Sequence, residues 1–215
     1  MLLQNESAPV PESAFICVHC GRIQPNLPPD VDYFALFGIP ERFLLDESLL
    51  ERRFREWQRR LHPDKFAGRQ RQEPASEGHS AHAQALHAEK ASALVNAAHD
   101  VLKSPHSRAL YMLAERGVTL EPEHDDVTEQ REMAPDFLEE MLALREQLDE
   151  AAQSQESLRA LASWISEAKS RVCRELDEAF EQSSQSTDES MRRCRDLAAR
   201  LQFYNRLEMA AKERL

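Results

Sequence analysis

The sequence predicts an all-α protein, a helical hairpin followed by a three-helix bundle. Residues that favour helices (Ala, Leu, Glu, Arg and Gln) dominate the 215-residue chain, which contains only 5 Gly. Apolar residues recur at helical spacing in several long segments, and Pro or Gly marks the ends of those segments. A chain of this length is long enough to bury two small cores. We therefore expect two helical domains.

The first predicted domain follows an N-terminal arm. Residues 1–30 hold five of the 11 prolines and show no periodicity, so we expect a flexible arm. Asp46 is a residue type that favours the N-cap position, and after it a helix is predicted that ends at Pro63. Its apolar stripe consists of Leu50, Phe54, Trp57 and Leu61, and its other faces carry mainly arginine.

A second long helix completes the hairpin. The polar residues 67–80 predict a loop, and a helix is expected from about Ala81 to the Ser104-Pro105 break. Its apolar face is predicted to carry Leu94, Ala98 and Val101. A shorter helix over about residues 107–116 is expected to end at Gly117, which suits the left-handed conformation that follows many helices. The first domain therefore spans residues 31–117.

The acidic residues 118–134 form the predicted linker, and a second domain spans residues 135–215. Three helical patterns, over about 135–152, 156–183 and 188–213, are separated by short polar segments. Short connections imply antiparallel neighbours and hence a three-helix bundle. The predicted core stripes are Phe137, Met141, Leu144 and Leu148; Leu161, Ile165, Ala168, Val172 and Ala179; and Leu197, Leu201 and Tyr204.

Charge is distributed unevenly along the chain. Residues 118–215 contain 13 Lys and Arg against 23 Asp and Glu, a net charge of −10, whereas residues 1–117 contain 14 against 15, a net charge of −1. The acidic half would repel nucleic acid, and the basic helix face lacks interleaved aromatic residues for base stacking. We therefore expect no nucleic-acid partner.

A membrane partner is not expected either, because the sequence has no run of about 18 apolar residues. The 4 cysteines do not form a disulfide framework, which is typical of a reducing compartment. The first residues match neither a secretory signal nor a basic transit peptide. The expected location is a bacterial cytoplasm rather than a mitochondrial matrix.

The most specific motif is His62-Pro63-Asp64, which lies between the basic helix and the second long helix. Asp32-Tyr33-Phe34-Ala35-Leu36-Phe37-Gly38 stands upstream, and Lys65-Phe66 follows the motif directly. Downstream come Asn96-Ala97-Ala98-His99 and Pro105-His106-Ser107-Arg108-Ala109. From about Asp32 to the C-terminus, this arrangement resembles J-domain co-chaperones of the HscB/Jac type, which serve iron–sulfur cluster assembly. The resemblance implies a J-domain followed by a C-terminal helical bundle.

The resemblance implies that the chain docks on a DnaK/HscA-type chaperone and accelerates its ATP hydrolysis. Asp64 would present a carboxylate to a partner arginine, and an arginine face on the preceding helix could steer the encounter. The expected chaperone-binding residues are His62, Pro63, Asp64, Lys65, Arg52, Arg55 and Arg59. The alternative is that the arginines only solvate a helix and the tripeptide is an ordinary turn.

A second candidate surface lies on the first helix of the bundle. Leu138 and Leu142 sit about 100° round the helix from the core stripe, where apolar residues are unnecessary, and Glu139, Glu146 and Glu150 frame them. Phe203 is offset in the same way from its own stripe, with Leu207 one turn on. The resemblance implies that Leu138, Leu142, Glu146, Glu150 and Phe203 bind an IscU-like cluster scaffold. The sequence departs from the family pattern at Ala143, and the alternative is that these apolar residues fill a wide bundle interface.

Cys17-Val18-His19-Cys20-Gly21 looks like half of a zinc knuckle. Three readings stay open: an empty pair, a zinc site completed by His19 or by a second chain, or a coding sequence that begins further upstream. A thioredoxin-like use is not supported, because no strand–helix setting surrounds the pair.

We therefore expect a non-enzymatic co-chaperone that activates a partner's ATPase and delivers the scaffold to it. The alternatives are a general J-protein for another client, and a zinc or redox regulator that uses Cys17 and Cys20. An enzyme is not expected, because the sequence has no glycine-rich phosphate loop, no His/Glu metal pair at helical spacing and no nucleophile motif. No cofactor is required, and zinc at the two cysteines is the one candidate.

Overall fold

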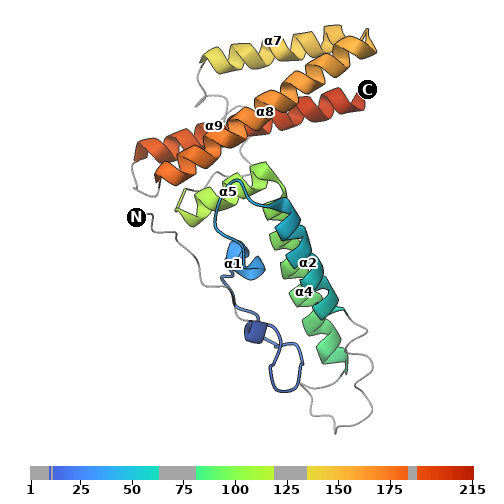
Figure 1. Cartoon of the computed structure of the whole chain (residues 1–215), viewed down its shortest axis with the longest axis vertical. Coiled ribbons are helices and arrows are strands. Elements are labelled where there is room, and N and C mark those ends of the chain that lie inside the picture. The colour runs from blue at the N-terminus through green and yellow to red at the C-terminus, as the bar shows by residue number, and fades with distance from the viewer. Residues whose placement is uncertain (1–9, 11, 63–80, 119–134, 184–187) are drawn as a thin grey trace. The chain divides into compact units, whose positions relative to one another are not determined.

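The computed structural model of the chain describes residues 10, 12–62, 81–118, 135–183 and 188–215 (Figure 1). Within these ranges the protein is all-helical, as predicted, with seven α-helices and one short 3-10 helix. The chain divides into two compact units, the first made of Met1–Glu41 with Leu45–Ser104 and the second of Arg42–Leu44 with Pro105–Leu215. No helix of the described residues is both long enough and apolar enough to cross a bilayer.

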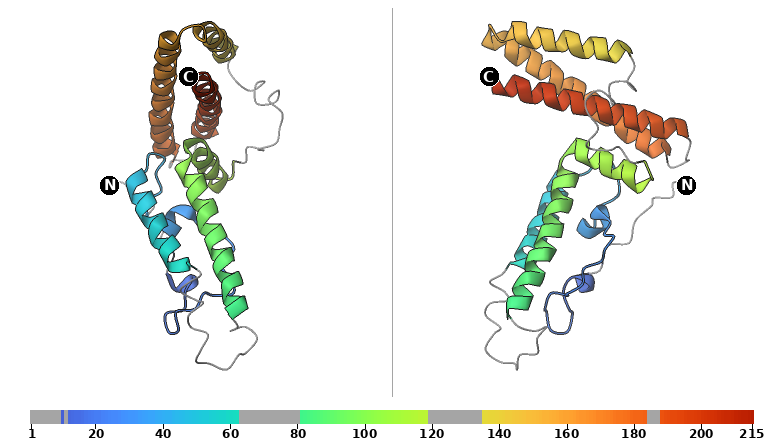
Figure 2. Two further views of the ribbon diagram at one scale, coloured as in Figure 1. Left: turned by 90° about the vertical axis from the view of Figure 1, so that its right-hand side faces the viewer. Right: turned by 180° about the vertical axis from the view of Figure 1, so that it is seen from behind.

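In the first unit, the short helix α1 (Tyr33–Phe37) packs against two long helices, α2 (Glu47–Leu61) and α4 (Ala81–Lys103). Figure 2 shows α2 and α4 side by side and running in opposite directions, which confirms the predicted hairpin. Side-chain caps set where two of these helices begin. Asp32 Oδ1 accepts a hydrogen bond from the Phe34 N–H at 2.8 Å, and Asp46 Oδ1 accepts one from the Leu49 N–H at 3.0 Å.

The core of the first unit lies between these three helices. On α2, Leu50, Trp57 and Leu61 are buried as predicted, and Trp57 Nε1 donates a hydrogen bond to the Leu36 carbonyl at 3.0 Å. On α4, the buried apolar residues are Ala88, Ala91, Val95, Ala98 and Leu102. The small alanine side chains allow α4 to pack close to the bulky residues of α1 and α2.

The predicted apolar face of α4 was partly wrong. Ala98 is fully buried, but Leu94 and Val101 are only half-buried. The helix is rotated relative to the prediction because its tightest contacts are made by alanines, which the search for large apolar residues did not weigh.

Residues 12–30 are not the flexible arm that the sequence predicted. Phe15 is fully buried, with its ring centroid 4.9 Å from that of Trp57, and Ile23 is 2% exposed. The side-chain amide of Gln84 on α4 bonds both backbone groups of Ile23: its Oε1 accepts from the N–H at 3.0 Å and its Nε2 donates to the carbonyl at 3.3 Å. Two apolar side chains and one buried amide therefore hold this segment in place.

The second unit contains α5 (Pro105–Glu115), α7 (Pro135–Ala151), α8 (Gln155–Ser183) and α9 (Asp188–Glu213), close to the predicted bounds. Helices α8 and α9 form a long pair, α7 packs against both, and α5 packs against α9 (Figure 1). All predicted core residues of α7 and α9 are buried, whereas Leu161 on α8 is half-buried. The buried apolar residues of α8 are Leu158, Ile165, Ala168, Val172, Leu176, Ala179 and Phe180.

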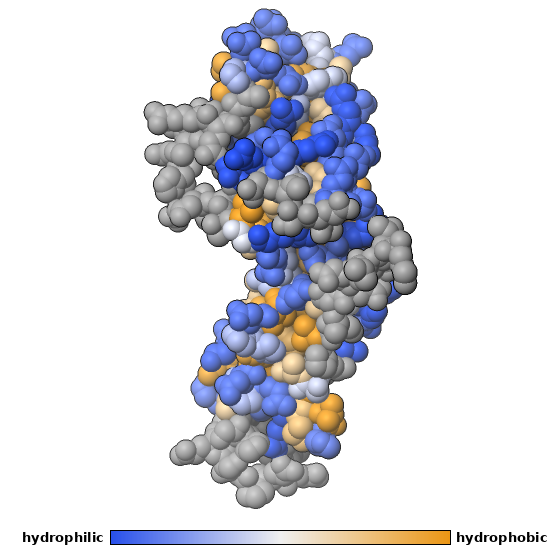
Figure 3. Space-filling view, turned by 90° about the vertical axis from the view of Figure 1, so that its left-hand side faces the viewer, coloured by the Kyte–Doolittle hydropathy of each residue, from blue (hydrophilic) through white to orange (hydrophobic). Residues whose placement is uncertain are grey.

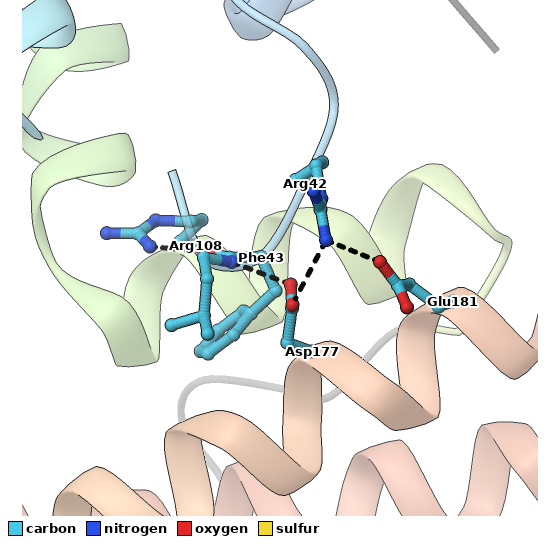
Figure 4. Close-up of polar contacts among 6 residues, drawn as sticks. Arg42, Phe43, Arg108, Asp177 and Glu181 are labelled. Atoms are coloured by element: carbon cyan, nitrogen blue, oxygen red, sulfur yellow. Dashed lines mark hydrogen bonds and ion pairs between the residues drawn. The ribbon is translucent and has the colours of Figure 1, made fainter. Parts of the chain in front are cut away.

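The loop before α2 contributes three residues to the second unit (Figure 4). Phe43 is 1% exposed and its ring stacks on that of Phe180 in α8, with centroids 5.9 Å apart. The buried guanidinium of Arg108 in α5 donates a hydrogen bond to the Phe43 carbonyl and lies over the ring, 5.5 Å from its centroid. The aromatic side chain is thus enclosed on two sides.

The residues on either side of Phe43 bond to acidic groups of α8. The Leu44 N–H donates to Asp177 Oδ1 at 2.8 Å, and the Arg42 guanidinium pairs with Asp177 at 3.5 Å and with Glu181 at 2.5 Å (Figure 4). These contacts, together with the packing of α5 on α9, explain why the compact units do not follow the predicted division after residue 117.

Candidate partner-binding surfaces

Helix α2 presents arginine on the side opposite its buried stripe. Arg52, Arg55 and Arg59, which we call the α2 arginine face, are all exposed, as predicted. They lie at i, i+3 and i+7, and therefore on one side of a helix whose other side enters the core. Arg59 Nε also donates a hydrogen bond to the Arg55 carbonyl at 3.2 Å. The face forms a local concentration of positive charge in a chain of net charge −11.

Polar contacts join α2 to α4 next to the α2 arginine face. Glu51 lies 3.3 Å from Lys103 Nζ and 3.1 Å from His99 Nε2, and the pKa of its carboxyl is lowered, first by the hydrogen bond from Lys103 and then by that from His99. The Phe54 ring stacks on the His99 ring with centroids 3.9 Å apart. Phe54 is therefore half-buried against a histidine rather than in the apolar core. Its position in the apolar stripe of the helix had predicted a core residue.

The predicted chaperone-binding turn begins at His62. This residue is exposed and has an extended backbone (φ −59°, ψ 128°), the conformation that a following proline favours. Pro63, Asp64 and Lys65 lie outside the described residues, so their predicted role stays a prediction. The structure describes the helix that leads into the turn and its last residue, His62.

Figure 3 shows one face of the molecule, where hydrophilic residues predominate and hydrophobic residues are exposed in small separate areas. On such a mainly hydrophilic surface, a large apolar side chain that is exposed is a candidate contact for a partner protein. Of the residues predicted to bind a scaffold, Leu142 is 64% exposed, Glu146 and Glu150 are exposed, and Leu138 and Phe203 are half-buried. We call these five residues the α7–α9 patch.

Aromatic contacts anchor Phe203 beside α7. Its ring meets that of Phe137 edge-on, with centroids 5.7 Å apart, and Phe137 is the neighbour of Leu138 in the chain. The Arg200 guanidinium lies 4.7 Å from the Phe137 ring centroid. Leu207, expected beside Phe203, is 8% exposed and belongs to the core instead. Phe203 is thus the half-buried edge of a packed aromatic cluster, with Leu138 next to that cluster in the chain.

Tyr204 belongs to the same aromatic cluster. Its hydroxyl donates a hydrogen bond to Glu140 Oε1 at 3.2 Å. Burial, followed by the charge and hydrogen bond of Glu140, raises the pKa of Tyr204 to about 12. The hydroxyl therefore stays protonated and acts as a fixed donor that joins α9 to α7.

A groove on the other flank of α7 was not anticipated. It has a volume of about 530 Å³ and lies between α7 and α8, with Trp164 at 39% exposure on its wall. Its lining residues are Glu140, Ala143, Leu144, Gln147, Ala160, Leu161 and Trp164. Ala143, the position that departs from the family pattern, thus lies on the α8 side, in this groove. The signal in the sequence was a Trp placed one residue before the core position Ile165.

The cysteine motif forms a tight turn in the first unit. The Cys17 N–H donates to the Arg22 carbonyl and the Gly21 N–H to the Cys17 carbonyl, each at 2.8 Å, and Gly21 has a positive φ of 65°. The backbone N–H groups of Cys20 and His19 and the Cys20 thiol form hydrogen bonds to the Cys17 sulfur, which lowers the pKa of that thiol. Cys17 is half-buried and Cys20 is exposed.

A closed structural zinc site needs four ligands. Over the described part of the chain, no group of three or more His, Cys, Asp or Glu is arranged to hold a metal ion. Cys17 and Cys20 therefore do not fit a closed zinc site built from the described residues.

One protein family and two solved structures are similar to this chain. Residues 133–212 match the family described as the HSCB C-terminal oligomerisation domain. The chain is similar to the human co-chaperone protein HscB, with 27% identity and a TM-score of 0.76 over 96% of this chain and 93% of that one. It is also similar to the chaperone HscB from Vibrio cholerae, with 29% identity and a TM-score of 0.66 over 85% of this chain and 96% of that one.

A helical hairpin followed by a bundle of long helices is the architecture of J-domain co-chaperones of the HscB type. Within that class the match of the C-terminal domain and the similarity of the whole chain agree on one type. The chain has the fold of the HscB co-chaperones over nearly its whole length, and its C-terminal domain matches the HSCB C-terminal domain.

Proposed function

We propose that this co-chaperone stimulates ATP hydrolysis by a DnaK/HscA-type chaperone and delivers an IscU-like iron–sulfur scaffold protein to it. The observation that carries the proposal is the α2 arginine face, three exposed cations on the helix that leads directly to His62-Pro63-Asp64. An HscB-type fold supports this role by resemblance. The chain itself would be an activator and not an enzyme.

Electrostatics would govern the encounter with the chaperone. Exposed charges attract an oppositely charged surface over about one Debye length, roughly 8 Å at physiological ionic strength. An acidic patch on the chaperone would therefore be guided towards the α2 arginine face, and the rate would fall as salt is added. His62 and Pro63 would shape the turn, Lys65 would add a further cation, and Asp64 would present its carboxylate to a chaperone arginine.

The α7–α9 patch would hold the scaffold. Leu142, which is 64% exposed, the half-buried Leu138 and Phe203, and two exposed glutamates have the composition of a binding surface, with apolar and charged residues together. Burial of Leu142 and Phe203 by the scaffold would provide affinity. Glu146 and Glu150 would select a partner with positive charge at the rim.

The two activities would reinforce each other because one chain carries both. A scaffold held by the C-terminal bundle has a high effective concentration near the chaperone that the J-domain engages. The chaperone would then close on its client at the moment when its ATP is hydrolysed.

The test is steady-state ATPase stimulation of a purified DnaK/HscA-type chaperone by the full chain. Asp64→Asn removes the carboxylate charge at nearly constant volume and should abolish stimulation, while Glu89→Gln, an exposed change of the same kind on α4, should leave it intact. Circular dichroism should show an unchanged helix content for both variants. Normal stimulation by Asp64→Asn would overturn the chaperone half of the proposal.

The scaffold half is tested separately by calorimetric titration with an IscU-like protein. The double variant Leu138→Ala with Phe203→Ala removes two half-buried apolar contacts and should weaken scaffold binding while ATPase stimulation in the absence of scaffold stays normal. A dissociation constant equal to that of the wild type would place the scaffold site elsewhere on the chain.

A further inference from the structure

The groove between α7 and α8 has no part in the function proposed so far. Its volume is about 530 Å³, and the larger apolar side chains that line it belong to Leu144, Leu161 and Trp164. Ala143 of α7 and Ala160 of α8 also line it, and both are exposed. Because alanine side chains are small, the space between the two helices stays open. Trp164 is 39% exposed, although tryptophan is highly buried on average.

We propose that this groove is a second contact for the IscU-like scaffold and that it takes a large apolar side chain of that protein. The inference rests on the proposed function, and the groove shares no lining residue with the α7–α9 patch. Tryptophan is among the residue types most enriched where the energy of an interface is concentrated. Its side chain buries a large apolar area and has few rotatable bonds, so little entropy is lost on binding.

The size of a stable interface supports a second contact. A specific interface takes roughly 800 Å² of surface and about 20–30 residues from each partner. The α7–α9 patch consists of five residues, so a scaffold bound there also covers neighbouring surface. An α-helix with its side chains is about 10–12 Å across. A partner that covers Leu142 on one flank of α7 therefore reaches the groove on the other flank.

Exposed residues connect the patch to the groove across α7. Leu142 and Ala143 are consecutive and both exposed, and at about 3.6 residues per turn they lie about 100° apart around the helix. The surface between them carries the carboxylates of Glu139, Glu146 and Glu150, which are exposed as well. The scaffold thus crosses a strip of negative charge between its two apolar contacts.

The charge beside the groove determines which kind of scaffold segment fits. Glu140 lines the groove, and its Oε1 accepts the hydrogen bond from the Tyr204 hydroxyl at 3.2 Å, so this carboxylate has a fixed position. Like the strip on α7, it favours a cationic group on the partner. The groove therefore fits a segment in which a large apolar residue is adjacent to Lys or Arg.

The test is calorimetric titration of the full chain with a purified IscU-like scaffold. Trp164→Ala should raise the dissociation constant by about 30-fold, the lower limit for a hot-spot residue. Ser163→Ala, at the neighbouring exposed position of α8, is the matched control and should bind as the wild type does. Ala143→Leu fills the groove without removing a side chain from it, and it should also weaken binding. Circular dichroism should show an unchanged helix content for all three variants.

Tryptophan fluorescence reports the contact directly. The chain has two tryptophans, and Trp57 is buried at 6% exposure, so Trp164 is the one whose surroundings can change on binding. A scaffold whose own tryptophans are replaced by phenylalanine should shift the emission of the wild type to shorter wavelength. The same scaffold should leave the emission of Trp164→Phe unshifted.

Wild-type affinity of Trp164→Ala, or an unshifted emission of the wild type on binding, would overturn the groove as a scaffold contact. The α7–α9 patch is tested separately by Leu138→Ala with Phe203→Ala. If that double variant binds the scaffold normally while Trp164→Ala does not, the groove stands and the patch fails. Failure of the groove and failure of the proposed scaffold site are therefore distinguishable.

Discussion

Arg108 is a charged side chain at only 3% exposure, and it faces a backbone carbonyl and an aromatic ring. A buried polar group stabilises a fold only when its hydrogen bonds are made. The Phe43 carbonyl depends on this guanidinium for its bond, and the Phe43 ring fills the space between Arg108 and α8. The contact joins α5 to a three-residue segment more than sixty positions earlier in the chain.

Arg108→Met should lower the free energy of unfolding by about 1–3 kcal/mol, because it leaves the Phe43 carbonyl buried without its donor while keeping most of the side-chain volume. Urea unfolding of the full chain measures the change. Arg159→Met, at an exposed site on α8, is the matched control and should be nearly neutral. An equal loss of unfolding free energy in the two variants would mean that the buried contact stabilises the fold no more than an exposed arginine does.

Leu142 and Leu144 lie two residues apart on α7 but differ in exposure, at 64% and 5%. Leu144→Ala should destabilise the protein by about 2–5 kcal/mol, because it opens a cavity in the core. Leu142→Ala should leave the stability nearly unchanged and weaken binding of an IscU-like scaffold. Thermal unfolding and calorimetric titration of the same two samples separate the effects, and an exchange of the two phenotypes would refute the assigned face of α7.

Glu208 joins two lysines, with Lys169 Nζ at 2.9 Å and Lys212 Nζ at 3.2 Å. The hydrogen bond from Lys169, followed by that from Lys212, lowers the pKa of Glu208 below its usual 4.5. A carboxyl whose pKa is lower in the folded state stabilises the protein above its unfolded pKa, and this contribution is lost as pH falls through the folded pKa.

Glu208→Gln should therefore cost about 1 kcal/mol or less at neutral pH, the usual range for a partly exposed ion pair. Between about pH 5 and about pH 3 the variant should lose less stability than the wild type, since it has no such carboxyl to protonate. Urea unfolding across this range is the measurement. Glu178→Gln, at an exposed site on α8, is the control, and parallel curves for wild type and Glu208→Gln would contradict the argument.

At the scale of the element, α2 carries different residues on its two opposite sides. Its apolar stripe fixes the helix on α1 and α4, and its exposed side carries the α2 arginine face. Because these sides are separate, charge on the outer side can be changed without disturbing the core. The Glu51 contacts to His99 and Lys103 would persist in such variants.

Arg52→Gln with Arg55→Gln should slow association with a DnaK/HscA-type chaperone by about tenfold at low ionic strength, the lower end of the range for electrostatic steering. The difference from wild type should shrink as salt is added. Stopped-flow or surface-based kinetics measures the association rate. Arg192→Gln with Arg193→Gln, two exposed arginines of α9, makes the same change in net charge and should have little effect if the steering is local.

The elements with strong periodicity could be predicted from the sequence to within one or two residues. The bounds of α2, α7, α8 and α9 follow from caps, prolines and apolar stripes that all lie within each segment. The turn around Cys17 and Cys20 could not be placed in this way, because its order depends on Trp57 and Gln84, which are distant in the sequence. Local patterns report local preferences, and they miss segments that are held by remote partners.

The candidate surfaces show the same limit. The α2 arginine face and the exposed Leu142 follow from helical spacing alone, and their exposure is confirmed. The groove beside Trp164 depends on how α7 and α8 pack against each other, which the apolar stripe of a single helix does not predict. His99 was visible as part of a motif, but its stacking on Phe54 and its contact with Glu51 require the packed hairpin.

At the scale of the whole molecule, the proposed function requires both surfaces on one chain. Asp64→Asn lacks the proposed chaperone contact, and Leu138→Ala with Phe203→Ala lacks the proposed scaffold contact. An equimolar mixture of these two variants should not restore the extra ATPase stimulation that scaffold gives with the wild type, because the effective concentration arises from covalent linkage. Full recovery in the mixture would show that delivery does not need a single chain.

The path of the chain through the two units affects how the protein can be dissected. Residues 42–44 and α5 belong to the second unit, yet they precede residue 118, whereas α8 and α9 follow residue 135. A protease that cuts once between these two positions would leave Phe43 and Arg108 on one fragment and Phe180 on the other. Because the two fragments would still share a core, they should co-purify until a denaturant is added. A truncated chain that ends near residue 118 would instead expose the apolar side of α5 to solvent.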